Sequence, residues 1–191
     1  LLHGPDNFGS SAEEKIALRR EAWAVLAEHH AGADADATPV VRSIGVSNFE
    51  TRHIESLSGL AVPAVNQVER HPLCPQWELL EYCAANHIVL QAHSPLGNGH
   101  ARLMQHETVQ RVVRASGLTV AGVLLRWNLA HGVAVAPKCS SASHAADVLA
   151  AGRDGLAADH MAALDGILER WRAVNPPYMW RPGREGAHYG W

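Results

Sequence analysis

Short runs of apolar and β-branched residues alternate with longer amphipathic segments along nearly the whole chain. The runs predict strands over residues 40–47, 64–68, 88–92 and 133–136. The segments around them predict helices over residues 10–30, 48–58, 76–86, 106–115, 119–130, 143–150 and 157–170. Alternation of this kind implies a parallel sheet. Since no Gly-x-Gly-x-x-Gly follows a strand, we expect a (β/α) barrel rather than a doubly wound dinucleotide-binding sheet.

The composition is that of one globular α/β domain. The chain has 191 residues and 47% of them are hydrophobic, so we expect a single domain over 1–191 with a Pro- and aromatic-rich tail at about 172–191. A net charge of −3 without a basic run argues against nucleic acid as a partner. No apolar stretch approaches the roughly 20 residues of a membrane-spanning helix. The three cysteines, Cys74, Cys83 and Cys139, match no metal spacing and predict free thiols in a reducing cytoplasm.

Two of the predicted strands end in polar residues. Ser47 and Asn48 end the first, and the second ends in the stretch 66–71, which contains Asn66, Gln67 and Glu69. Ligands bind at the carboxyl ends of the strands in parallel α/β folds. The two strand ends therefore predict one small-molecule site built from amides and hydroxyls.

The first residues read as the end of a strand that leads into a loop. They are Leu1-Leu2-His3-Gly4-Pro5-Asp6, and neither an initiator Met nor a signal peptide precedes them. A domain rarely begins at the end of a strand, so we expect further sequence upstream.

Five ordered motifs resemble the aldo-keto reductases. They are IGVSNF, VNQVERHP, SPLG at 94–97, VLLRWNLAHG at 123–132 and VAVAPK at 133–138. The resemblance runs from Leu2 to about Trp171. It implies a (β/α)8 barrel of the TIM type, in a cytoplasmic enzyme that is monomeric at full length. The implied enzyme reduces a small aldehyde or ketone with NADP(H), and NAD(H) is a second candidate cofactor. The opening residues match the end of the fourth strand, so the resemblance implies a partial barrel of strands 4 to 8.

The same resemblance assigns a catalytic role to His3, which would hydrogen-bond the substrate carbonyl. The Asp, Tyr and Lys that complete the family's catalytic tetrad belong to the first three strand-loop units, which this chain does not hold. We therefore expect that the 191-residue chain does not catalyse reduction unaided.

The cofactor residues implied by the resemblance divide into a nicotinamide group and an adenosine group. Ser47, Asn48 and Gln67 would hold the carboxamide, and His93 stands where the family usually has a stacking aromatic. The adenosine side would be served by the pyrophosphate loop and the residues after the last strand: Ser94, Leu96, Asn98, Lys138, Cys139, Ser140, Ser141, His144 and Asp147. His144 replaces an Arg that clamps the 2′-phosphate, which predicts weaker discrimination between NADP and NAD, because a mostly neutral imidazole cannot form a bidentate fork.

Each of these residues also has a purely structural interpretation. Ser47 and Glu50 have the spacing of a capping box for the next helix, 94–99 could be a plain turn, and Lys138 could be a surface lysine. Tyr178 and Trp180 could line the substrate pocket or pack the tail onto the barrel. The remaining histidines, such as His106, read as surface residues.

Two other functions remain open on the sequence. One is a non-catalytic regulatory module that binds a nicotinamide cofactor, which the upstream sequence would distinguish from an enzyme. The other is an unrelated barrel enzyme such as an aldolase, for which Lys138 at the rim is a poor Schiff-base candidate.

Overall fold

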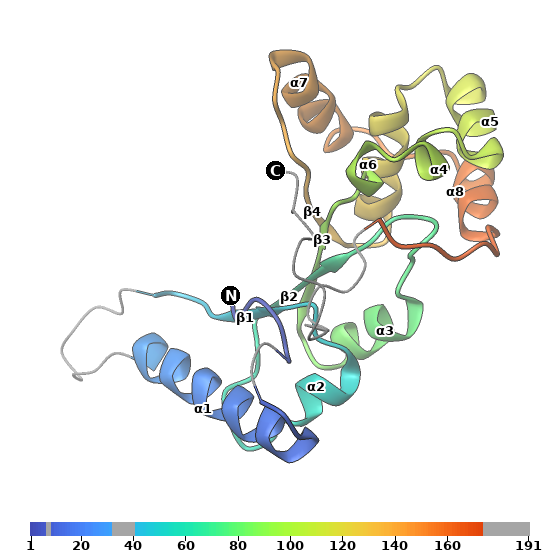
Figure 1. Ribbon diagram of the computed structural model, residues 1–191. Helices are drawn as coiled ribbons and strands as arrows, with labels where there is room; N and C mark the ends of the chain where they lie inside the picture. The colour runs from blue at the N-terminus through green and yellow to red at the C-terminus, as the bar shows by residue number, and fades with distance from the viewer. Residues whose placement is uncertain (7–8, 32–40, 174–191) are drawn as a thin grey trace.

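A four-stranded parallel sheet forms the centre of the computed structural model, which describes residues 1–6, 9–31 and 41–173 (Figure 1). The strands follow one another in the order β1 Gly45–Ser47, β2 Val65–Glu69, β3 Val89–His93 and β4 Ala134–Ala136. Leu2 adds a parallel bridge beside β1, where its N–H donates to the Gly45 carbonyl at 2.9 Å. The predicted parallel alternation, including the strand-like opening residues, is confirmed.

The helices follow the predicted order, with small differences at their ends. They are α1 Ala12–Ala31, α2 Thr51–Glu55, α3 Trp77–Ala85, α4 Ala101–Met104, α5 Glu107–Ser116, α6 Val120–Ala130, α7 Ala142–Ala151 and α8 Ala158–Asp165, with a 3-10 turn η1 at Gly97–Gly99. Helix α4 was not expected, and α8 ends earlier than the predicted residue 170. Tyr178 and Trp180 lie outside the described residues.

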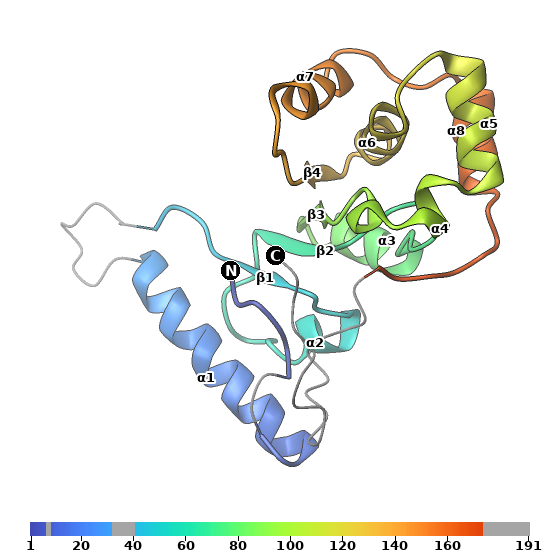
Figure 2. The ribbon, with the colours of Figure 1, turned by 45° about the horizontal axis from the view of Figure 1, so that its top comes forward.

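Two hydrophobic clusters hold these elements together. The first packs one face of the sheet, including Val46, Val68 and Leu90, against α1, α2 and α3. The second joins α4, α5, α6 and α8 around Trp127 and Leu164. Figure 2 shows α1 and α2 on one side of the strands and α5 to α8 grouped beyond β4.

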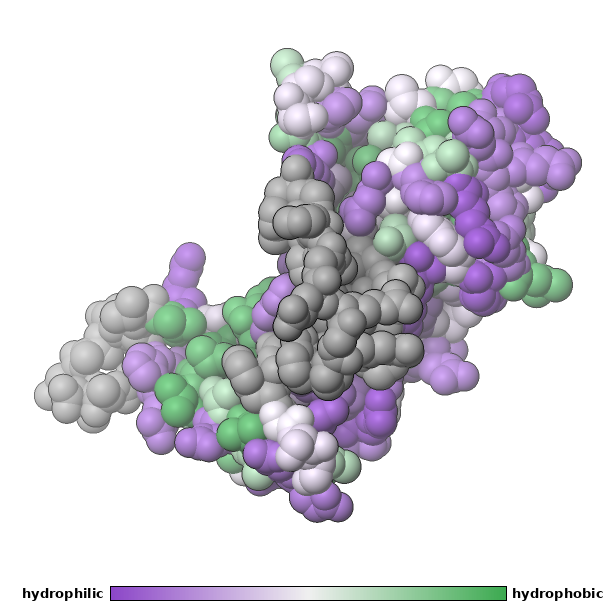
Figure 3. Space-filling model, viewed as in Figure 1, coloured by the Kyte–Doolittle hydropathy of each residue, from purple (hydrophilic) through white to green (hydrophobic). Residues whose placement is uncertain are grey.

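Helix α1 covers the first cluster with only part of its apolar surface. Trp23 is completely buried and donates its indole N–H to the Ala61 carbonyl at 2.7 Å, whereas Ile16, Leu18 and Val25 are exposed. The hydropathy surface shows green patches over this helix (Figure 3). The amphipathic pattern therefore found the helix, but the structure buries less of its apolar side than the pattern suggests.

The predicted capping box at Ser47 and Glu50 is wrong. Ser47 belongs to β1, and its hydroxyl donates to the Gln67 carbonyl of the neighbouring strand at 2.8 Å. Helix α2 begins after Glu50, whose N–H donates to Nδ1 of His53 at 3.0 Å. The hydroxyl is thus committed to the strand end instead of the helix. The predicted cap of α6 is confirmed, because the Thr119 hydroxyl accepts the Gly122 N–H at 2.9 Å.

Candidate functional site

A row of polar side chains crosses the sheet near the carboxyl ends of its strands. Ser47, Gln67 and Gln91 are partners in the parallel register of β1, β2 and β3. Their chain neighbours Val46, Val68 and Leu90 face the helices, so alternation along each strand turns the polar row to the opposite face. The Gln67 amide donates to Oε1 of Gln91 at 2.5 Å. Sequence reasoning found Ser47 and Gln67 but missed Gln91.

Asn48 connects this row to two histidines. Its amide nitrogen donates to Oγ of Ser47 at 2.8 Å and to the main-chain carbonyl of His3 at 3.0 Å. Its oxygen lies 2.9 Å from Nε2 of His93, which therefore carries the ring proton. Asn48 adopts a φ of 63°, a left-handed conformation that Asn tolerates better than most residues. The bonds hold its side-chain amide in one orientation.

His93 favours the neutral state. Burial lowers the pKa of His93 from its usual value of 6.5, and His3, His71 and Arg172 lower it further, while Glu69 opposes them. With the proton on Nε2, Nδ1 can accept from the Ser94 hydroxyl at 3.2 Å. His93 is therefore a half-buried, uncharged ring at the end of β3.

A completely buried amide supports the turn beneath Asn48. Asn66 donates to the Phe49 carbonyl at 2.8 Å and accepts the Phe49 N–H at 3.4 Å. These two bonds fix the backbone just after the left-handed Asn48. We infer that Asn66 supports the site from the helix-facing side of the sheet without facing a ligand itself.

The segment after His3 is held from helix α1. Arg19 donates from Nε to the Pro5 carbonyl at 2.9 Å and from Nη2 to Asp6 at 2.8 Å. The Arg19 side chain is 4% exposed and that of Asp6 22%, so the ion pair is partly buried. The side chain of His3 itself is exposed. Arg19 thus positions the loop that carries the predicted catalytic residue, and an isolated Arg in a helix gave no signal of that role.

The loop after β3 is a tight turn with unusual backbone angles. Ser94, Gly97 and Asn98 have φ values of 46°, 55° and 53°. The N–H groups of Gly97 and Gly99 donate to the carbonyls of Ser94 and Leu96 at 2.8 and 3.0 Å. Strained backbone of this kind concentrates at ligand sites, and left-handed turns can gather N–H groups around an anion. The loop is compatible with a plain turn and with the predicted pyrophosphate contact.

The adenosine-side candidates lie beyond β4, at the same edge of the parallel sheet. Lys138, Cys139 and Ser140 are exposed. The Ser141 hydroxyl caps α7 by accepting the His144 N–H at 3.2 Å, and Oγ of Ser140 lies 3.3 Å from Nδ1 of His144. Asp147 is half-buried on α7. These residues form a local group that is separate in the hydrogen-bond pattern from the Asn48 network.

Charged side chains at the end of β2 and directly after it are buried. Nε2 of His71 lies 2.9 Å from Glu69, and both side chains are buried. Arg70 lies 4.2 Å from the ring centre of Trp127 and donates to Asn128 at 2.9 Å. Burial lowers the pKa of Arg70 to about 10, still high enough to keep the guanidinium charged near neutral pH. His106, expected as a surface residue, caps α5 by accepting the Thr108 N–H at 3.2 Å.

Two kinds of site have no candidate in the part of the chain that the structure describes. No group of His, Cys, Asp and Glu side chains in residues 1–6, 9–31 and 41–173 could hold a metal ion. Across the same residues, no helix combines the length and the apolar character that crossing a bilayer requires.

Comparison with known proteins identifies the family. The profile described as "Aldo/keto reductase family" matches residues 19–169, most of the chain. This chain belongs to the aldo/keto reductase family. A curated "Aldo-keto reductase" of Mycolicibacterium vanbaalenii is 43% identical over 135 residues, which cover 70% of this chain and 48% of the relative. A "9,11-endoperoxide prostaglandin H2 reductase" of Trypanosoma cruzi is 34% identical over 150 residues, or 77% of this chain and 53% of that protein.

Solved structures of aldo/keto reductase type share the fold. A mutant of Gox0644 in complex with NADPH has a TM-score of 0.71 and 32% identity, covering 85% of this chain and 58% of that one. An aldo/keto reductase from Brucella melitensis has the same TM-score at 28% identity, with coverages of 85% and 58%. The chain spans about half the length of the curated relatives that it matches.

Proposed function

We propose that this chain provides the cofactor half of an enzyme that reduces an aldehyde or ketone to an alcohol with NAD(P)H. The proposal includes a single partial barrel of strands 4 to 8, a cytoplasmic location, a small carbonyl substrate and a monomer at full length. One observation carries it: a hydrogen-bonded row of amides and hydroxyls lies at the carboxyl ends of adjacent strands in an aldo/keto reductase chain.

The polar row fits a nicotinamide carboxamide, which has one acceptor and one amide donor. Gln67 uses one amide hydrogen on Gln91, which leaves its second hydrogen and its oxygen for a ligand. The hydroxyl hydrogen of Ser47 and both amide hydrogens of Asn48 already donate to protein oxygens. The side-chain oxygens of these two residues would therefore accept hydrogen bonds from the carboxamide N–H groups. When bound, the reduced nicotinamide supplies a hydride to the carbonyl carbon. The neutral ring of His93 would lie against the cofactor without adding a charge.

The adenosine side would depend on charge rather than on a prearranged network. Lys138 would meet the 2′-phosphate as a point charge, with hydroxyl and thiol groups of 139–141 beside it. Since His144 cannot form a bidentate clamp, we expect a preference for NADPH over NADH below about a hundredfold, or ~2.7 kcal/mol.

His3 would donate a hydrogen bond to the substrate carbonyl and orient it. Its main chain is bonded to Asn48, so the carbonyl and carboxamide sites share one support. The proton donor of the family lies outside the motifs that match here. We therefore propose that the 191-residue chain binds the cofactor but does not turn over substrate.

The test is a titration of the purified chain with NADPH, followed by nicotinamide fluorescence. Gln67→Ala should weaken binding by about tenfold, the loss of one to two good hydrogen bonds. Gln105→Ala is the matched control, because Gln105 is an exposed amide just after α4. Unchanged affinity in Gln67→Ala, or no NADPH binding by the wild type, would contradict the proposed cofactor site. Carbonyl-dependent oxidation of NADPH by the wild-type chain would contradict its proposed inactivity.

A regulatory module that binds the cofactor without reducing a substrate is the second candidate. In a longer protein that carries this chain, the absence of the tetrad's Asp, Tyr and Lys upstream would favour the module. In a longer protein that carries this chain, His3→Ala should abolish turnover while preserving NADPH affinity if the protein is an enzyme. A protein that binds NADPH but reduces none of a panel of aldehydes and ketones would support the module.

A further inference from the structure

A buried carboxylate holds the last described residues against the loop after β2. Glu69 is 4% exposed, and its Oε1 accepts hydrogen bonds from Nε2 of His71 and from the backbone N–H of Ala173. A buried carboxylate is costly unless hydrogen bonds compensate for its lost hydration. The second of these donors is the main-chain N–H of Ala173, which lies 104 positions from Glu69 in the sequence. The bond therefore fixes the position of a distant segment.

Trp171 is fixed by the same loop and contacts the turn after β3. The main-chain N–H of Trp171 donates to the Leu73 carbonyl at 2.8 Å. Its ring lies between His71 and His100, with ring centres 5.8 and 4.7 Å away. A Cβ placed on Gly97 would lie 3.4 Å from the Trp171 ring. The indole therefore packs directly beside the tight turn that contains Gly97.

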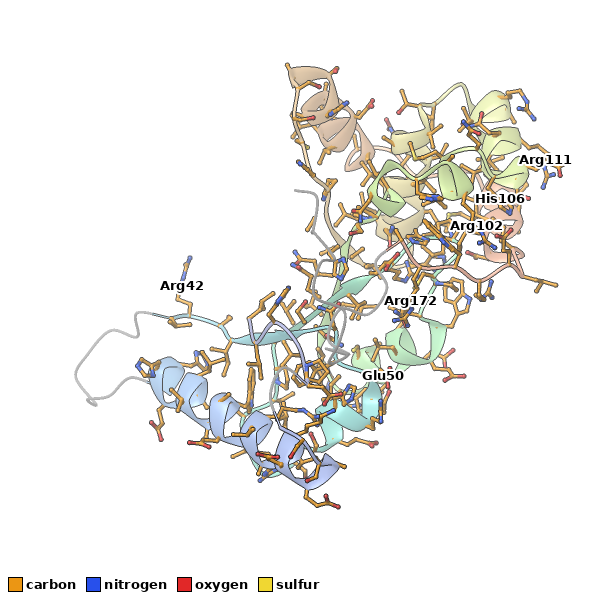
Figure 4. The ribbon with its side chains drawn as sticks, viewed as in Figure 1. Arg42, Glu50, Arg102, His106, Arg111 and Arg172 are labelled. Atoms are coloured by element: carbon orange, nitrogen blue, oxygen red, sulfur yellow. The ribbon has the colours of Figure 1, made fainter. Side chains whose placement is uncertain are left out.

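Arg172 lies between these two anchored residues. It lines a groove of about 990 Å³ together with Gln76 and Trp77 at the start of α3. Figure 4 shows Arg172 beside α3. Burial is the main cause of the lowered pKa of His93, and Arg172 is the weakest contributor to it. The segment 171–173 is thus placed between the loop after β2 and the candidate cofactor residues after β3.

We propose that Glu69 is a positioning residue, which orders the loop 94–99 through the anchored segment 171–173 and so raises cofactor affinity without contacting the cofactor. The carboxylate holds Ala173, the adjacent Trp171 ring supports Gly97, and the turn keeps its N–H groups in place. The effect on affinity rests on the proposed cofactor site. The effect on the loop does not, because it can be measured without a cofactor.

The first experiment is amide hydrogen exchange on the cofactor-free, full 191-residue chain. Glu69→Ala should lower protection of the Ala173, Trp171, Gly97 and Gly99 N–H groups by about tenfold, as expected for local opening, and leave the β3 amides of Leu90 and Ala92 unchanged. Glu69→Gln, which keeps the shape and one acceptor, should restore part of the protection. Glu81→Ala, an exposed acid on α3, is the control. Unchanged protection at Gly97 and Gly99 in a folded Glu69→Ala chain would overturn the proposal, and so would equal loss at Leu90.

The second experiment measures NADPH affinity in a double-mutant cycle. Glu69→Ala and Trp171→Ala should each weaken binding by roughly fivefold, and together by little more than either alone, because they act through one path. Fully additive losses would overturn that path. If the wild type fails to bind NADPH, the cofactor site and the affinity effect both fail, while the exchange result still decides whether Glu69 orders the loop.

Discussion

The strand-end cluster around Asn48 and the segment after β4 are organised in different ways. In the cluster, Ser47, Asn48 and His93 are buried or half-buried and bonded to one another before any ligand arrives. After β4, Lys138 and its neighbours are exposed, and their hydrogen bonds serve mainly to begin α7. The first region is preorganised by its neighbours on three strands, whereas the second offers charge and hydroxyls on a surface.

The difference predicts how each region would contribute to binding. A preorganised polar site loses little side-chain entropy on binding and is insensitive to salt. An exposed lysine must be ordered by its ligand, and its attraction is screened by ions. Substitutions in the cluster should therefore have large effects that do not depend on salt, and substitutions after β4 should have smaller effects that do.

The largest effect is expected for the support under the cluster. Asn66→Ala would leave the buried N–H and carbonyl of Phe49 without partners, which should lower the free energy of unfolding by about 2–4 kcal/mol. Urea denaturation measures it. The control is Asn86→Ala. The exposed Asn86 side chain donates to the Tyr82 carbonyl, and its loss should lower the free energy of unfolding by less than about 0.5 kcal/mol. Equal costs for the two variants would mean that Asn66 does not support the site.

The next effect is on cofactor affinity. Asn48→Ala removes the amide that ties Ser47, His3 and His93 together, and it places Ala in a left-handed conformation. We expect NADPH and NADH affinities to fall alike by about 30-fold, or ~2 kcal/mol, at low and high salt. A loss confined to NADPH, or one that disappears at high salt, would assign Asn48 to the phosphate side instead.

How much of this arrangement was predictable depends on whether a residue repeats a pattern. Ser47, Gln67 and Glu69 were found because polar residues end apolar runs. Gln91 was missed because the run 88–92 reads as a uniformly buried strand. Arg19 and Asn66 act across long sequence separations, to Pro5 and Phe49, which periodicity does not encode. The predicted helix 157–170 is too long, because apolar periodicity continues past Gly166, which caps the end of α8.

A smaller effect is expected after β4. Lys138→Met should weaken NADPH binding by about fivefold to tenfold at low ionic strength and leave NADH binding nearly unchanged. The reason is that a single exposed ammonium would contact the 2′-phosphate, which NADH lacks. Titrations at low salt and at roughly 0.5 M salt separate this electrostatic effect from a packing effect. The difference in NADPH affinity between wild type and variant should shrink at the higher ionic strength if it is electrostatic. A loss of equal size for NADH would remove Lys138 from the phosphate site.

The smallest effect concerns the pH dependence of stability in the cluster. Burial holds the folded-state pKa of His93 below 6.5, so the unfolded chain takes up a proton that the folded chain resists, and stability falls as the pH drops below about 6.5. Burial lowers the pKa of His53 in the same direction, with Arg19 and Arg52 contributing. His93→Gln, whose amide can still donate to Asn48, should reduce the fall in melting temperature between about pH 7 and pH 5.5. His53→Asn, which can still accept the Glu50 N–H, is the comparison away from the strand ends. If only His53→Asn flattens the dependence of melting temperature on pH, the loss of stability at low pH comes from protonation of His53 at the start of α2. The ring of His93 can then be charged without cost to the fold.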